Sequence, residues 1–128
     1  MDVFKPARPE WVAKYYIINI YFKVTGLEAA AFSKGDKKLL DLYKSGVRQL
    51  YRILRPKIIQ YGSRLGMSKE KIAKYEEYMK PSRFRKLTLE EVSEWFNDIQ
   101  IVLERLGYTK FEKGENIESA LEESRRGW

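Results

Sequence analysis

Hydrophobic residues follow a helical rather than a strand-like pattern in the first quarter of the chain. The segment 11–32 is almost continuously apolar and contains one candidate break, at Gly26, where a helix would bend or split. The segment is far longer than a typical strand. Pro9 suits the first turn of a helix, because the backbone N–H that proline lacks would have no acceptor within the helix there. Apolar side chains recur on two faces of this expected helix: Trp11, Tyr15, Ile18 and Phe22 on one, and Tyr16, Ile20 and Val24 on the other. Because a helix that is apolar on most sides is usually surrounded by others, we predict that it lies centrally.

A second helix is expected after a short connector that ends at Asp36, a residue suited to capping a helix N-terminus. Apolar residues then alternate in steps of three and four, as in a coiled-coil seam: Leu40, Tyr43, Val47, Leu50 and Leu54. So short a connector places the two long helices antiparallel. We expect Pro56 to kink or interrupt the second helix and Gly66 to end it.

Two more helices are predicted by their capping residues. Ser68 is placed to cap a short helix that runs to Met79. Thr88 and Glu91 have the spacing of a capping box. The helix that they begin carries an apolar stripe and ends at Gly107: Val92, Trp95, Phe96, Ile99, Val102, Leu103 and Leu106. A last, short amphipathic helix is expected over residues 116–124.

These elements predict an all-α protein, an antiparallel helical bundle of four main helices plus a short C-terminal helix. A length of 128 residues is typical of one domain. We therefore assign residues 1–128 to a single helical domain, with loosely ordered ends at 1–8 and 125–128. No apolar stretch is long enough to span a bilayer and the N-terminus lacks the layout of a signal peptide, so we expect a cytoplasmic protein with no membrane partner. Abundant Lys, Glu, Arg, Ile and Tyr, with few Asn, Gln, Cys and His, are typical of thermophilic chains.

The residue types present argue against an enzyme. The sequence has no cysteine and no histidine, which removes the thiolate nucleophile, the commonest general base and the commonest transition-metal ligands. No phosphate-binding glycine loop or nucleophile elbow is found, and Glu91, Glu94 and Asp98 share what we take to be a solvated helix face. We therefore predict a non-enzymatic protein without a metal, a cofactor or a small-molecule substrate. The periodic tyrosines, such as Tyr43 and Tyr75, are interpreted as core residues whose hydroxyls reach the edge of the core.

Charge is distributed unevenly along the chain, whose net charge is +7. Residues 1–33 contain four basic and three acidic side chains. Residues 34–86 contain sixteen basic and five acidic ones, and residues 87–128 contain five basic and ten acidic ones. This uneven distribution of charge is the strongest non-random feature of the sequence.

On a helical wheel at about 100° per residue, the basic residues of the second helix share one face beside its apolar seam. We call this set the basic stripe: Lys37, Lys44, Arg48, Arg52 and Arg55. From Lys44 to Arg55 it covers about 16 Å of helix axis, enough to meet several phosphates of a duplex. Asp41 lies among these residues and weakens the pattern.

A second basic cluster, made of Arg83, Arg85 and Lys86, lies in the predicted link before the capping box. Arginines beside an aromatic residue can hold phosphate and stack on bases. The next helix begins with acidic residues and is therefore a poor anion site. We interpret Phe84 as a core residue beneath the link rather than a stacking platform.

Three interpretations of the basic residues stay open. They can be solvated or paired within the molecule with the acidic last third, they can bind nucleic acid, or they can meet an acidic protein. We predict a nucleic-acid-binding protein that contacts the phosphates of DNA or RNA through the basic stripe and the Arg83–Lys86 cluster. The alternative is a structural or adaptor protein, or a homo-oligomer, that joins basic residues 34–86 to acidic residues 87–128. An ion pair from Glu94 or Asp98 to Arg48 or Arg52 would show that the stripe is already occupied.

Overall fold

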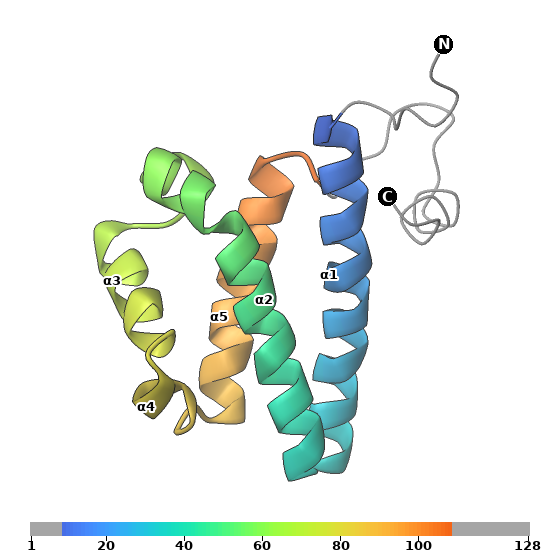
Figure 1. Ribbon diagram of the computed structural model, residues 1–128. Coiled ribbons are helices and arrows are strands. Elements are labelled where there is room, and N and C mark those ends of the chain that lie inside the picture. The colour runs from blue at the N-terminus through green and yellow to red at the C-terminus, as the bar shows by residue number, and fades with distance from the viewer. Residues whose placement is uncertain (1–8, 109–128) are drawn as a thin grey trace.

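The computed structural model of the protein describes residues 9–108, and every regular element within them is a helix (Figure 1). In chain order these are α1 (Pro9–Lys34), α2 (Lys37–Tyr61), the 3-10 turn η1 (Gly62–Leu65), α3 (Lys69–Tyr78), α4 (Pro81–Phe84) and α5 (Leu89–Arg105). The predicted all-α class is confirmed. The predicted helix 116–124 and the chain ends 1–8 and 125–128 lie outside the described residues.

The helix starts are confirmed where the sequence places capping residues. The Asp36 carboxylate accepts a hydrogen bond from the amide of Lys38 at 2.8 Å, which satisfies a donor at the start of α2. Ser68 accepts from the amide of Lys71 at 3.1 Å in the same way. At α5 both halves of the capping box are formed between Thr88 and Glu91.

Three local expectations are corrected. The expected interruptions are wrong, because α1 continues through Gly26 and α2 continues through Pro56; a bend at either residue stays a prediction. A proline in a helix removes one backbone hydrogen bond, but the neighbouring Leu54 and Ile58 are fully buried and their packing holds the chain in place. α2 ends at Tyr61 rather than near Gly66, whose positive φ of 85° instead ends the 3-10 turn η1.

The three long helices lie side by side, and α3 and α4 lie on the side of α2 and α5 away from α1 (Figure 1). α1 runs in the opposite direction to α2 and α5. The finer expectation of an antiparallel bundle of four main helices is not confirmed, because α3 has only ten residues and the predicted link after it contains the helical turn α4. Within residues 9–108, no helix has both the length and the hydropathy needed to cross a membrane.

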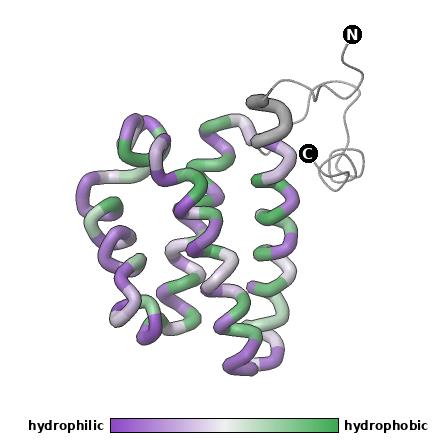
Figure 2. The backbone as a smooth tube through the Cα atoms, viewed as in Figure 1, coloured by the Kyte–Doolittle hydropathy of each residue, from purple (hydrophilic) through white to green (hydrophobic). Residues whose placement is uncertain are grey.

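α2, not α1, is the central helix, which corrects the expectation from the sequence. α1 lies at one flank and packs mainly against α2 (Figure 1). Hydrophobic and hydrophilic positions alternate along α2 and α5, whereas α3 and α4 are mostly hydrophilic (Figure 2). α3 is nevertheless joined to the core by an aromatic cluster. In it the ring centroid of Trp95 lies 5.5–5.8 Å from the ring centroids of Tyr51, Tyr75 and Tyr78.

Candidate nucleic-acid interface

The basic stripe of α2 faces α3 and α4, and tertiary packing gives its five members different surroundings. Lys37 and Arg52 are exposed. Within residues 9–108, neither makes a side-chain hydrogen bond or an ion pair. These two residues therefore keep the free, solvated guanidinium and ammonium groups that contact with phosphate requires.

Lys44 departs most from expectation, because it is buried, with 6% of its surface exposed. Its Nζ donates long hydrogen bonds of 3.4 Å to the carbonyl oxygens of Phe84 and Arg85. The Asp41 carboxylate lies 3.7 Å from the same nitrogen. Lys44 thus joins α2 to the end of α4, and the predicted exposure of the basic stripe fails at this position.

Arg48 is half-buried and packs on an aromatic ring. Its guanidinium carbon lies 4.2 Å from the centroid of Phe84, which is within the range of a cation–π contact. Phe84 itself is 8% exposed, which confirms that it is a core residue. A guanidinium stacked in this way is held in one orientation, and its N–H groups, which point outward in the guanidinium plane, can still donate to a phosphate.

Arg55 is engaged with an acidic partner. It forms a bidentate ion pair with Glu76 of α3, with nitrogen–oxygen distances of 2.7–3.0 Å. Tyr51 donates a further hydrogen bond to the same carboxylate at 2.8 Å. The hydrogen bonds from Arg55 hold the pKa of Glu76 below its usual value. Arg55 is therefore withdrawn from the set of residues free to bind phosphate.

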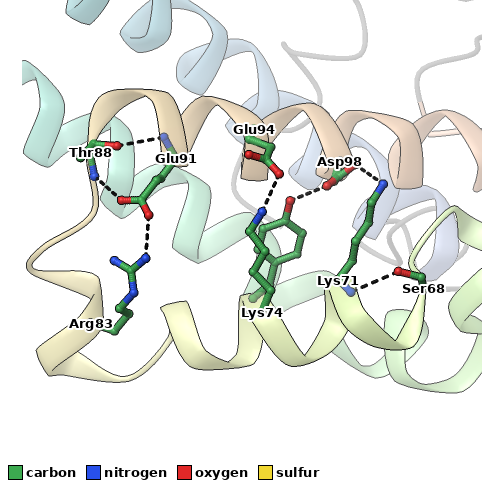
Figure 3. Close-up of polar contacts among 9 residues, drawn as sticks. Ser68, Lys71, Lys74, Arg83, Thr88, Glu91, Glu94 and Asp98 are labelled. Atoms are coloured by element: carbon green, nitrogen blue, oxygen red, sulfur yellow. Dashed lines mark hydrogen bonds and ion pairs between the residues drawn. The ribbon is translucent and has the colours of Figure 1, made fainter.

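Arg83 is engaged in the same manner, whereas the rest of its cluster is not. Arg83 donates to Glu91 at 2.6 Å (Figure 3) and also lies over the ring of Tyr78. The Arg83 guanidinium, together with the Thr88 amide, lowers the pKa of Glu91. Arg85 and Lys86 are exposed, and their side chains have no hydrogen bond or ion pair within the described part of the chain.

Two of the free cations, Lys37 and Arg85, line a groove between α2 and α4. Its volume is about 410 Å³, and it is lined by Lys37, Asp41, Lys44, Ser45, Phe84 and Arg85. Among the lining residues, Lys44 is buried, whereas Lys37 and Arg85 are exposed. The structure therefore brings the N-terminal half of the basic stripe next to Arg85, although the two are about forty positions apart in the sequence.

The acidic face of α5 is paired, but not with the basic stripe. Lys74 reaches Glu94 at 2.5 Å and Lys71 reaches Asp98 at 3.1 Å (Figure 3). Within residues 9–108, neither acid pairs with Arg48 or Arg52. The intramolecular network expected from the charge distribution thus exists, but its cations come from α3 and α4, and the outer face of α2 stays unneutralised by it.

Asp98 corrects a further expectation. The sequence pattern assigns it to a solvated face, yet it is only 8% exposed and accepts hydrogen bonds from Lys71 and from the buried hydroxyl of Tyr75. Its spacing from Trp95 and Val102, three residues after one and four before the other, is the signal that it lies on the apolar stripe. Within the described residues, no group of three or more His, Cys, Asp and Glu side chains could hold a metal ion.

Comparisons with known proteins add no relative to this picture. No protein-family model matches the sequence. No curated protein and no solved structure matches it at a significant level.

Proposed function

We propose that this protein binds the phosphate backbone of DNA or RNA through the groove between α2 and α4, without enzymatic activity. The contacts come from Lys37, Arg48, Arg52, Arg85 and Lys86. We call these residues the groove cations. We also propose that the helices form an antiparallel bundle with α3 as its short fourth member. The protein is proposed to act in the cytoplasm.

The observation that carries the proposal is that two unpaired cations from distant segments of the sequence, Lys37 and Arg85, line one groove. Arg48 and Arg52 follow Lys37 along the same face of α2. Two carboxylates of the helices that follow α2 are already engaged: Glu76 with Arg55, and Glu91 with Arg83. Asp41 is the acid that remains at the groove, and it lies beside Lys44. From Lys37 to Arg52 the cations span about 22 Å along α2, a length over which duplex DNA presents several phosphates.

The decisive measurement is fluorescence anisotropy with random-sequence duplex and single-stranded DNA and RNA, titrated with salt. We expect binding with a log–log salt slope of roughly −3 to −5, because each neutralised phosphate contributes about −0.9 for a duplex. Replacing Lys37, Arg52, Arg85 and Lys86 together with alanine should flatten the slope by about one for each phosphate that is no longer neutralised.

A matched variant controls for net charge. Lys23, Lys57, Arg64 and Lys69 are also exposed, and replacing them with alanine removes the same charge from other parts of the surface. This variant should keep most of the affinity and the full slope. Absence of binding at low salt, or equal weakening of both variants, would overturn the proposal.

The alternative is a structural or adaptor protein, or a homo-oligomer, that joins basic residues 34–86 to acidic residues 87–128. Three of those acidic residues, Glu91, Glu94 and Asp98, already have partners inside the molecule. An acidic protein of a different kind could still occupy the same groove. Retention of such a protein by the native chain, with no binding of nucleic acid, would favour that alternative.

A further inference from the structure

α1 carries two heptad-spaced lines of uncharged residues on different sides of the helix. One line is Ile17, Ile20, Val24, Leu27 and Ala31; the other is Tyr15, Ile18, Phe22, Thr25, Ala29 and Phe32. At about 100° per residue their centres lie about 150° apart. A spacing of alternating three and four residues is the pattern by which one helix packs along another.

The first line is used inside the molecule. Ile17, Ile20, Val24 and Ala31 belong to the hydrophobic core, and Leu27 packs against it. α1 approaches α2 closely here, because a Cβ at Gly46 would lie 2.7 Å from a methyl group of Val24. The requirement of α1 for a packing partner on this side is thus met by α2.

The second line is exposed over its C-terminal half. Tyr15 and Ile18 are buried, but Phe22 is 36% exposed and Phe32 is 51% exposed. Thr25 and Ala29 between them are exposed too. The Thr25 hydroxyl donates to the carbonyl oxygen of Tyr21 at 2.9 Å, so its polar group is satisfied and its methyl group can pack. We call Phe22, Thr25, Ala29 and Phe32 the outer seam.

We propose that the outer seam is a self-association surface, on which α1 of a second copy packs antiparallel. Along the chain, the four side chains of the outer seam are large, small, small and large. They are separated by three, four and three residues, a spacing that reads the same in both directions. In an antiparallel pair, Phe22 therefore faces Phe32 of the second copy, and Thr25 faces Ala29. The small residues at the centre of the seam allow the two helices to approach closely. The phenylalanine rings at its two ends pack against each other across the interface. A surface of this kind satisfies the requirement of a two-fold interface that one patch complement itself.

The outer seam is uncharged, so it is a surface on which two copies of this basic chain meet with little repulsion. The chain carries a net charge of +7, so most approaches of two copies are opposed by like charges. No position of the outer seam is charged, and exposed aromatic rings on one face are characteristic of interaction surfaces. The seam lies on α1, away from the groove between α2 and α4, so the inference does not depend on the proposed function.

The test is sedimentation velocity across a wide concentration series. The native chain should change from monomer to dimer as concentration rises. Ala29→Glu places a charge at the centre of the seam and should stay monomeric. At a concentration where the native chain is also monomeric, its melting temperature should be unchanged, because the site is exposed in the monomer. Gln60→Glu adds the same charge at an exposed site on α2 and should dimerise like the native chain.

Two outcomes would overturn the proposal. One is a native chain that is monomeric at every concentration. The other is an Ala29→Glu variant that dimerises as the native chain does. A monomeric native chain whose melting temperature falls on Ala29→Glu substitution would show instead that another part of the same chain covers the seam.

The antiparallel direction has its own test, because the sequence contains no cysteine that would interfere. Single variants Thr25→Cys and Ala29→Cys are mixed and oxidised under equilibrium conditions. Antiparallel packing predicts that the mixed disulfide between the two variants exceeds both symmetric ones. A preference for the symmetric disulfides would indicate parallel packing and contradict the proposed geometry.

Discussion

Lys44 and Arg48 are one helical turn apart on α2, yet packing gives them different roles. Lys44 is buried and donates to two carbonyl oxygens at the end of α4. Arg48 stays half-exposed with its guanidinium on the ring of Phe84. Both residues are basic and both lie on the basic stripe, but only Arg48 keeps donors that solvent or a ligand can reach. Charge counted along a helix therefore overstates the charge that a partner meets.

Lys44→Ala should lower the free energy of unfolding by about 1–3 kcal/mol, the usual cost of leaving buried hydrogen-bonding groups without a partner. Arg52→Ala, at an exposed site of the same helix, should change it by no more than about 0.5 kcal/mol. Chemical denaturation of the two variants measures both values. Equal stability of the two would show that the ammonium of Lys44 contributes nothing to the attachment of α4.

At the scale of the element, α5 is the helix whose start is held most firmly. Thr88 and Glu91 exchange the two hydrogen bonds of the capping box, and Glu91 also accepts from Arg83 of α4. One carboxylate thus caps a helix and secures the short helix before it. The sequence predicted the box but not the additional hydrogen bond, because Arg83 reaches Glu91 only when α4 forms.

Thr88→Ala should destabilise the protein by about 1 kcal/mol, because the side chain that accepts from the amide of Glu91 is removed. Ser82→Ala is the matched control, since Ser82 is exposed and its hydroxyl makes no hydrogen bond within residues 9–108. Thermal unfolding by circular dichroism should separate the two variants. Identical melting temperatures would mean that water replaces the cap without cost.

On the scale of the whole molecule, three buried tyrosines tie the helices together through carboxylates. Tyr43 of α2 donates to Glu28 of α1, which also accepts from Ser93 of α5. Tyr51 of α2 donates to Glu76 of α3, and Tyr75 of α3 donates to Asp98 of α5. A satisfied buried polar network has one favourable arrangement. These hydrogen bonds therefore specify how the helices are rotated against one another, which apolar packing alone would leave less defined.

The same tyrosines predict unfolding at high pH. Burial, and next to it the hydrogen bond to a carboxylate, raises the pKa of Tyr43, Tyr51 and Tyr75 above the ordinary value of 10.0. The folded protein therefore holds these protons more tightly than the unfolded chain, so stability is fully present below about pH 10 and is lost as pH rises above it. Denaturation at a series of pH values should show this decline, and a triple variant with phenylalanine at the three positions should show a shallower one. A decline of equal steepness in both would assign alkaline unfolding to other groups.

Local sequence patterns predicted α1, α2, α3 and α5 and much of what α2 and α5 bury, but not the short helix α4. Caps at Asp36, Ser68 and Thr88 are local features in which a side chain bonds to amides two or three residues away, so no knowledge of the fold is needed to find them. The core positions of α2 and α5 were predicted for the same reason, because a 3.6-residue period places them on one face of each helix.

Tertiary structure alone decided which charges are free and which faces of α1 are covered. Arg55 and Asp98 lie on periodic faces like their neighbours, and Arg83 lies in what the sequence predicts as a link. Their partners come from other helices and depend on how these are rotated and spaced. Interactions between segments that are distant in the sequence leave no local periodic pattern, so the sequence alone does not predict them. The groove cations and the outer seam of α1 are the surfaces that remain after those pairings are made, which is why they emerge only from the folded chain.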